Sequence, residues 1–234
     1  MEAESTNFLL EVVVPTIGSV VAIAMFLSNM PGVLKVRARD DLGDLNVLPY
    51  PAILANCVGW VCYSFVKPNG FILAPNAPGV LIGLFYMLTC LPAAPRRTAD
   101  WVTGLSLLYT TAFLVAGSLT CYRDLTEESK QMLWGYTCNA ILITYYAAPL
   151  STLLQVWRTR NASSLSLPLA SANAANGALW LVYGLAIGDK FVSVPNGIGL
   201  SLAIVLLFSI FTFWPGRGRA KAEGSAARWE KAVI

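Results

Sequence analysis

Apolar residues run along this chain in long blocks, which short polar stretches separate. A helix of about 20 apolar residues is long enough to cross the hydrocarbon core of a bilayer, roughly 30 Å thick. The blocks approach or exceed that length and contain no Asp, Glu, Lys, Arg or His. The pattern predicts an all-α polytopic membrane protein with seven transmembrane helices, at residues 12–34, 46–66, 71–93, 101–122, 131–155, 165–187 and 191–214.

Charge is sparse and unevenly divided between the two sides of the predicted protein. Charged residues make up 12% of the 234 residues, about half the share usual in soluble domains. If the seven spans alternate in direction, 12 of the 16 Lys and Arg side chains fall on one side. Cytoplasmic loops hold the excess of Lys and Arg, so we expect an outside or lumenal N-terminus and a cytoplasmic C-terminus. Residues 215–234, rich in Gly, Ala and charge, are expected to be a disordered cytoplasmic tail.

The second half of the chain repeats features of the first. A Pro-Asn-x-x-Gly motif occurs as "PNAPG" at 75–79 and as "PNGIG" at 195–199. Two proline pairs recur at nearly the same offset, Pro31 with Pro149 and Pro49 with Pro168. Identical pairs separated by 120 positions include Asn56 and Asn176, Trp60 and Trp180, Tyr63 and Tyr183, and Asn76 and Asn196.

This repeat defines the expected domain organisation. Helices 1–3 (within residues 8–95) correspond to helices 5–7 (within 131–214), so helix 4 (101–122) is a linker without a counterpart. Three helices plus the linker make an even number, so both halves enter the membrane in the same direction. We therefore expect two parallel three-helix bundles joined by a linker helix, in a 3+1+3 order, with a site at their interface.

The repeated Trp and Asn residues are expected to form one layer across that interface. At about 1.5 Å of helix rise per residue, Trp60 and Asn76 both fall roughly 21–22 Å from the cytoplasmic edge. Trp180 and Asn196 reach the same level by the same estimate. An Asn amide can meet a sugar hydroxyl as donor and acceptor, and an aromatic ring can lie against the C–H face of the sugar. A Trp in a membrane helix is otherwise an interface anchor, and an Asn after Pro a helix cap or interhelical contact.

The paired motifs resemble those of the SWEET (MtN3/saliva) family of sugar facilitators. The resemblance rests on "LPYPAILANCVGWVCY" and "PNAPG" in the first half, and on "APLS", "LSLPL", "WLVYG" and "VPNGIG" in the second. It extends over residues 8–214. It implies a bidirectional sugar uniporter that works by alternating access, with two triple-helix bundles joined by a linker helix.

The same resemblance implies roles for particular residues. Substrate binding falls to Trp60, Asn76, Trp180 and Asn196. Asn56 and Asn176 either line the same cavity or hold helices together. Inner-gate hinges are implied for four prolines near cytoplasmic helix ends, although a simple kink is the plainer interpretation of each: Pro31, Pro49, Pro149 and Pro168.

An outer gate is implied for three further residues: Tyr63, Tyr183 and Asp189. Without the resemblance, they are equally well interpreted as two aromatic residues at the membrane–water interface and a charged residue in a loop. The first half departs from the second here, because Ser64 stands where the second half has Gly184.

The predicted mechanism is uniport without a cofactor. Proton-coupled transport usually uses an ionisable group inside the membrane, and the seven predicted spans contain none. Metal-dependent and acid–base enzyme chemistry lack the residues they need for the same reason. The alternatives are a seven-helix ligand-sensing receptor, which has no need of two equivalent halves, or a facilitator of sucrose or another small polar solute.

The expected partners are a mono- or disaccharide and the lipid bilayer, without nucleic acid. Two large rings, Trp60 and Trp180, facing one cavity favour a monosaccharide such as glucose over sucrose. The resemblance also allows homo-oligomers. The plasma membrane is the first expectation for residence, with the vacuolar or another internal membrane as the alternative.

Overall fold

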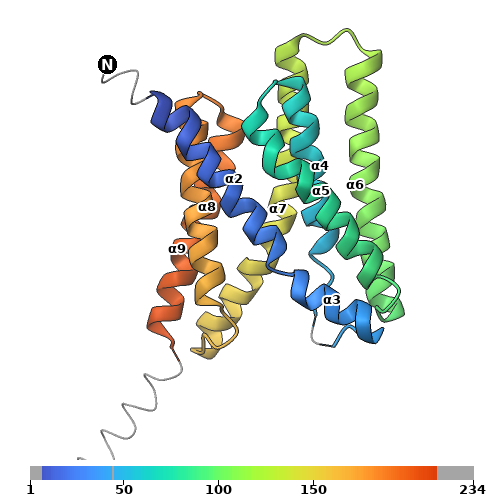
Figure 1. The fold of residues 1–234 in the computed structure, drawn as a ribbon, viewed down its shortest axis with the longest axis vertical. Coiled ribbons are helices and arrows are strands. Elements are labelled where there is room, and N and C mark those ends of the chain that lie inside the picture. Colours follow the sequence, from blue (N-terminus) through green and yellow to red (C-terminus); the bar gives the residue numbers. More distant parts are fainter. Residues whose placement is uncertain (1–6, 44, 215–234) are drawn as a thin grey trace, which may run out of the picture.

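The computed structural model describes residues 7–43 and 45–214, and in that part of the chain it consists of helices and their connections (Figure 1). Seven helical runs follow the seven apolar blocks. They comprise η1 (Leu9–Val13), α2 (Val14–Leu27) and α3 (Met30–Arg39) as the first run, then α4 (Tyr50–Val66), α5 (Gly70–Cys90), α6 (Arg96–Tyr122), α7 (Glu127–Thr159), α8 (Leu167–Ala186) and α9 (Lys190–Thr212). The predicted tail, 215–234, lies outside the described residues.

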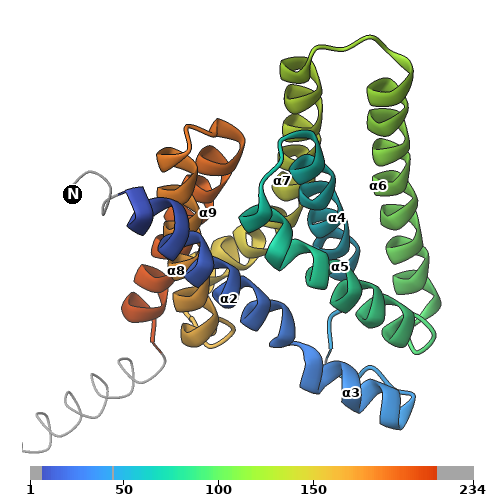
Figure 2. The same cartoon turned by 45° about the horizontal axis from the view of Figure 1, so that its top comes forward.

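The first run extends beyond the predicted 12–34 and is interrupted at Ser28 and Asn29. Pro31 has no N–H with which to continue the helical hydrogen bonds across this point. The hydroxyl of Tyr86, in α5, donates to the carbonyl oxygen of Phe26 at 2.8 Å and satisfies one group next to the break. Figure 2 shows α3 turned away from the line of α2.

The helices of each half pack in the same order. In the first half α5 contacts both α2 and α4, and in the second half α9 contacts both α7 and α8. The halves meet through two equivalent contacts, α2 with α8 and α4 with α7, while α6 packs against α4 and α7. The arrangement agrees with the predicted fold class of two three-helix bundles and a linker helix.

The two halves share their largest buried cluster at one end of the bundle, and a smaller cluster of Ala52, Ala55, Tyr109 and Ile141 also joins α4 and α6 to α7. At that end, which we call the Asp189 end, one buried cluster combines Trp60 and Tyr63 with Trp180 and Tyr183. At the opposite end, the Arg37 end, one cluster joins α3, α4, α5 and α6, and a separate cluster joins α7, α8 and α9. In Figure 1 the lower ends of α7, α8 and α9 lie apart from those of α3, α5 and α6. The bundle is therefore closed at the Asp189 end.

The helices have the length and outer surface expected of membrane spans. Within the described residues, five runs are long and apolar enough to cross a bilayer: Leu9–Arg39, Gly70–Cys90, Arg96–Tyr122, Glu127–Thr159 and Lys190–Thr212. The other two are the 17-residue α4 and the 20-residue α8, which carries one Ser and two Asn side chains. Large apolar side chains cover the outside, including Leu107, Leu108 and Leu114 on α6.

The proline kinks agree only in part with the sequence interpretation. Pro149 lies inside α7, and Pro31 follows the break between α2 and α3. Pro49 and Pro168 lie at the starts of α4 and α8, so the interpretation of an internal kink is wrong for both. A helix start has no intrahelical bond for Pro to remove, which is why these two positions accept proline without bending the helix.

Candidate functional site

Trp60 and Trp180 occupy equivalent places in the two halves. Each is 8% exposed, and both belong to the cluster that joins the halves. Each indole meets the Tyr one turn later in edge-to-face geometry, with ring centroids 5.4 Å apart for Trp60 and Tyr63 and 5.8 Å for Trp180 and Tyr183. The structure therefore brings both indoles into one buried cluster, in which little of either is exposed.

Asn76 and Asn196 make the same hydrogen bond in their two helices. The Nδ2 of Asn76 donates to the carbonyl oxygen of Ile72 at 2.8 Å, and that of Asn196 donates to Val192 at 2.7 Å. Ile72 and Val192 belong to the same cluster as the two Trp residues, so the amides lie one helical turn from it. No other described residue bonds these amides, which leaves one N–H and the Oδ1 of each available to a ligand.

The Pro-Asn-x-x-Gly motif accounts for this arrangement. Pro75 and Pro195 lie inside α5 and α9, where each removes a backbone donor and loosens the turn to which the Asn side chain bonds. The motif glycines are sites of close approach. A Cβ on Gly79 would lie 2.7 Å from the Cys57 sulfur, and one on Gly199 would lie 2.5 Å from the Tyr146 hydroxyl. The alternative that Asn76 and Asn196 are helix caps is wrong, because both residues lie inside helices.

Asn56 and Asn176 differ between the halves. The indole N–H of Trp60 donates to Asn56 Oδ1 at 3.1 Å. The Trp180 indole instead lies against α2, where a Cβ on Gly18 would be 3.3 Å from Trp180 Nε1. Asn176 Oδ1 is consequently buried with no hydrogen-bond partner among the described residues. A buried acceptor without a donor is costly, and a ligand hydroxyl that reached this atom would remove that cost.

The three residues predicted for the outer gate meet at the Asp189 end. The Tyr63 hydroxyl donates to Asp189 Oδ2 at 2.7 Å, and Lys67 Nζ forms an ion pair with the same oxygen at 2.8 Å. The Asp189 side chain is 0% exposed and that of Lys67 is 33% exposed. Gln131, from α7, donates to the Tyr63 hydroxyl at 3.1 Å. Asp189 is thus a fully buried, hydrogen-bonded carboxylate, which excludes the plain interpretation of a solvated loop charge.

Tyr183, in the second half, makes the matching contact with a residue of the first half. Its hydroxyl bonds the side chain of Asn69, 2.8 Å from Nδ2 and 3.0 Å from Oδ1. Asn69 and Asp189 are 120 positions apart, and each caps its helix, Asn69 at the start of α5 and Asp189 at the start of α9. Each half therefore places a Tyr against the capping residue of the other half. Only the second-half cap carries a charge.

Aromatic contacts follow the same crossed pattern. Tyr63 meets Phe191 of the second half with ring centroids 6.2 Å apart, and Tyr183 meets Phe71 of the first half at 6.0 Å. The departure at Ser64 and Gly184 does not touch these bonds. A Cβ on Gly184 would lie 2.6 Å from the Ser193 nitrogen, so this glycine serves the packing of α8 on α9, whereas the Ser64 hydroxyl bonds Val61 within α4.

Sequence reasoning missed Lys67, Asn69 and Gln131. The offset of 120 that pairs Tyr63 with Tyr183 also pairs Asn69 with Asp189, so Asn69 could have been found. Nothing in the sequence marks Lys67 or Gln131 as partners of this network. The four prolines are not part of it and lie toward the Arg37 end. No group of three or more His, Cys, Asp or Glu residues able to hold a metal ion occurs in the described part of the chain.

Each half contributes the same two kinds of surface to the interface between the halves. Trp60 and Trp180 supply flat apolar faces, and the neighbouring Asn amides supply hydrogen bonds without charge. Such a site suits a neutral, polyhydroxylated molecule with apolar faces between its hydroxyl groups. The bonded Tyr and capping residues at the Asp189 end separate this layer from that side of the bundle.

Comparison with known proteins identifies relatives that cover nearly the whole chain. The profile of the MtN3_slv family, described as sugar efflux transporter for intercellular exchange, matches residues 12–97 and residues 132–217. The bidirectional sugar transporter SWEET7 of Arabidopsis thaliana is 27% identical over 92% of this chain and 85% of its own length. The bidirectional sugar transporter SWEET4 of Oryza sativa subsp. indica is 30% identical over 83% of this chain and 77% of its own.

An animal relative and a solved structure agree with these matches. The sugar transporter SWEET1 of Danio rerio is 27% identical over 82% of this chain and 85% of its own length. The structure of a eukaryotic SWEET transporter superposes with a TM-score of 0.77 and covers 89% of this chain and 98% of the other, at 24% identity. At that identity the superposition shows a common fold.

Proposed function

Because the chain belongs to the family of sugar efflux transporters for intercellular exchange, we propose that it is a bidirectional sugar uniporter in a membrane. It moves a monosaccharide such as glucose down its concentration gradient by alternating access. The transport layer consists of Trp60, Asn76, Trp180 and Asn196, with Asn56 and Asn176 beside it.

One observation carries the proposal. Asn76 and Asn196 each donate a single side-chain N–H to a carbonyl oxygen in the preceding turn of their own helix. The remaining donor and acceptor of each amide match the donor and acceptor of a sugar hydroxyl. The unpartnered Asn176 Oδ1 adds a third acceptor on the same side as Trp180. A sugar between the halves would satisfy these groups while its C–H faces lie against the indoles.

Alternating access would follow from the unequal ends of the bundle. The Tyr63–Asp189 and Tyr183–Asn69 bonds close one end, whereas at the other end the cluster of α3, α4, α5 and α6 is separate from the cluster of α7, α8 and α9. Rocking of the halves would break the first set and bring the Arg37 ends together. Pro31 and Pro149, at a break and inside a helix, and Pro49 and Pro168, at helix starts, would provide the hinges.

We further propose an orientation and a substrate size. The excess of Lys and Arg at the Arg37 end favours that end as cytoplasmic, with the N-terminus outside or lumenal, in the plasma membrane. The indoles of both halves narrow the layer, which favours a monosaccharide over sucrose. Homo-oligomers are compatible with this function and are not required by it.

Uniport rather than proton coupling fits the charges of the site. Asp189 is the one buried charged residue among those described, and it is held by Lys67 and Tyr63 outside the Trp and Asn layer. A proton-coupled carrier would need a titrating group that the substrate contacts. The layer contains only amides and indoles.

The test is uptake of labelled glucose and sucrose by yeast cells that lack hexose transporters and express this chain. Trp180→Ala and Asn196→Ala are compared with the parent, with and without a protonophore. Matched controls are Trp101→Ala, whose side chain is 61% exposed on α6, and Asn161→Ala in the exposed α7–α8 connection.

We expect the parent and both controls to take up glucose, with or without the protonophore. Trp180→Ala and Asn196→Ala should take up glucose at least tenfold more slowly at equal surface expression. If the protonophore abolishes glucose uptake, the protein is a proton-coupled transporter and not a uniporter. Surface-expressed parent protein that moves neither sugar would favour another small polar solute or a ligand-sensing receptor.

A further inference from the structure

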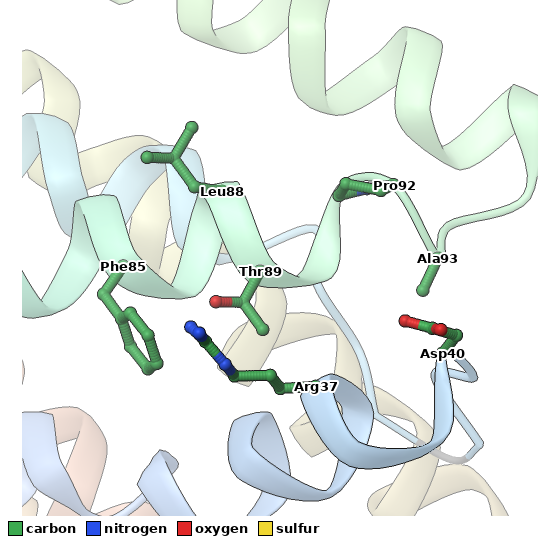
Figure 3. Close-up of a pocket in the computed structure, with 7 residues that line it drawn as sticks. All are labelled: Arg37, Asp40, Phe85, Leu88, Thr89, Pro92 and Ala93. Carbon is green, nitrogen blue, oxygen red and sulfur yellow. The ribbon is translucent and has the colours of Figure 1, made fainter.

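A second site lies away from the transport layer, between α3 and the end of α5. It is a cavity of about 480 Å³ lined by Arg37, Asp40, Phe85, Leu88, Thr89 and Ala93, together with Pro92 (Figure 3). Its residues come from the first half alone. None of these residues belongs to the transport layer, and the cavity lies at the Arg37 end of the bundle.

The cavity holds one positive and one negative side chain that do not pair with each other. The Arg37 guanidinium lies over the Phe85 ring, 6.0 Å from its centroid. Figure 3 shows it on the same side as the Thr89 hydroxyl, whereas the Asp40 carboxylate lies beside Ala93. Among the described residues no carboxylate forms an ion pair with Arg37. Asp40 likewise forms no ion pair with another residue in that part of the chain, so both charges can contact a ligand.

The backbone keeps these charges apart. Arg37 lies in the last turn of α3, and Asp40 caps that helix in the left-handed conformation with φ of 51°. The Phe85 ring holds the guanidinium toward α5 by a cation–π contact. A ligand that bridges the cavity must present an anion to Arg37 and a cation to Asp40.

An apolar track leads to the cavity along the outer face of α5. Leu81, Leu84 and Leu88 are 69%, 44% and 66% exposed, and their spacing of three and four residues places them in one row on the helix. In a membrane-spanning helix such a row faces acyl chains. The track ends at the side of the cavity where Leu88 forms part of the wall.

We propose that this cavity binds the headgroup of phosphatidylethanolamine. The phosphate meets Arg37 and the Thr89 hydroxyl, the primary ammonium meets Asp40, and an acyl chain follows the leucine track. Arg recognises phosphate through paired N–H donors, and a primary ammonium can donate hydrogen bonds to a carboxylate. The quaternary ammonium of phosphatidylcholine has no N–H to donate. The phosphatidylglycerol headgroup offers Asp40 no positive charge.

The competing occupant is an anionic lipid held by general positive charge. Lys35 and Arg39 on α3, and Arg96 and Arg97 at the start of α6, surround the cavity region with additional cations. Such a field attracts anionic lipids without regard to Asp40. The role of Asp40 is thus what separates the two possibilities.

The test counts lipids bound to the purified full-length protein by native mass spectrometry. Dioleoyl phosphatidylethanolamine, phosphatidylcholine and phosphatidylglycerol are added at equal concentration to the parent, Arg37→Gln and Asp40→Asn. Arg39→Gln and Asp41→Asn are the controls, because they make the same changes at neighbouring exposed positions that do not line the cavity.

We expect the parent to retain phosphatidylethanolamine over both other lipids, and each cavity variant to retain it about tenfold less, as expected for loss of one charged hydrogen bond. The controls should match the parent. Preference for phosphatidylglycerol that Asp40→Asn leaves unchanged or increases would overturn the proposal, as would equal retention of the two zwitterionic lipids. Thermal unfolding of the parent provides a check without variants, since only phosphatidylethanolamine should raise the melting temperature.

Discussion

The hydroxyl of Tyr63 in α4 donates a 2.7 Å hydrogen bond to the carboxylate of Asp189, the residue that caps α9 in the other half of the molecule. The equivalent Tyr183 bonds Asn69, the cap of α5. The two contacts are related by the internal repeat, but only one involves a charged group. Closure of the Asp189 end therefore depends more on the first contact than on its symmetric partner.

Removing the two hydroxyls should reveal that difference. Tyr63→Phe loses a hydrogen bond to a charged acceptor, which contributes about 1.5–3 kcal/mol, and also the bond from Gln131, whereas Tyr183→Phe loses its bond to a neutral amide, which contributes about 0.5–1.5 kcal/mol. We expect a larger drop in the melting temperature of purified protein for Tyr63→Phe. Equal drops would mean that the charge on Asp189 adds nothing to this closure.

Asp189→Asn makes the second-half cap like that of the first half. It keeps a cap for α9 and an acceptor for Tyr63 but leaves the Lys67 ammonium without its partner, so the closed end should open more often. Labelling of Cys62, next to Tyr63, by a membrane-impermeant maleimide should accelerate several-fold in a Cys121→Ser background, which removes the exposed cysteine. Lys67→Met should accelerate it too. An unchanged rate in both variants would exclude the ion pair as part of the closure.

Gly184 should be required for the packing of α8 on α9. A Cβ there would lie 2.6 Å from the nitrogen and 2.9 Å from the Cα of Ser193, which are backbone atoms that cannot turn away. Gly184→Ala should lower stability by about 1–3 kcal/mol, the usual cost of overpacking. Gly104→Ala, on the open face of α6 with no atom within 4 Å, should leave the melting temperature unchanged or slightly higher. Similar melting of the two variants would contradict this packing role.

Trp60 should restrict the size of the transported sugar. Its indole takes up space in the layer that it shares with Trp180, and Trp60→Ala removes the ring from one side. We expect lower glucose uptake and measurable sucrose uptake in this variant, because the sugar loses a stacking face and gains room. Trp101→Ala should transport neither more sucrose nor less glucose than the parent. Sucrose uptake by the unaltered protein would show that the indoles do not set the size limit.

Much of the fold could be predicted from apolar block length and internal repetition. Block length predicted all seven helical runs, and the offset of 120 predicted which helices correspond. A kink at Pro31 was predicted, but the position of the break at Ser28 and Asn29 was not, because an apolar block looks the same whether its helix is straight or interrupted. Pro49 and Pro168 were placed inside helices for a related reason, since apolar residues continue past the point at which hydrogen bonding begins.

The site was less fully predictable. Repetition singled out the Trp, Asn and Tyr pairs, and the structure brings the Tyr pair into crossed contacts between halves. The burial of Asp189 could not be read from a position flanked by Gly and Lys, because burial depends on how the two halves close over it. The unequal partners of Asn56 and Asn176 were equally hidden, since the sequence repeats both residues and only the Trp180 side-chain position distinguishes them.

The most direct measurement is counterflow in proteoliposomes made from the purified protein. Vesicles loaded with unlabelled glucose are diluted into a trace of labelled glucose, without any ion gradient. A bidirectional uniporter with the Trp and Asn layer as its site predicts transient accumulation of label by the parent and by Trp101→Ala, and little or none by Asn76→Ala, Asn196→Ala or Trp180→Ala. Folded parent protein that produces no accumulation, or layer variants that accumulate label as the parent does, would contradict it.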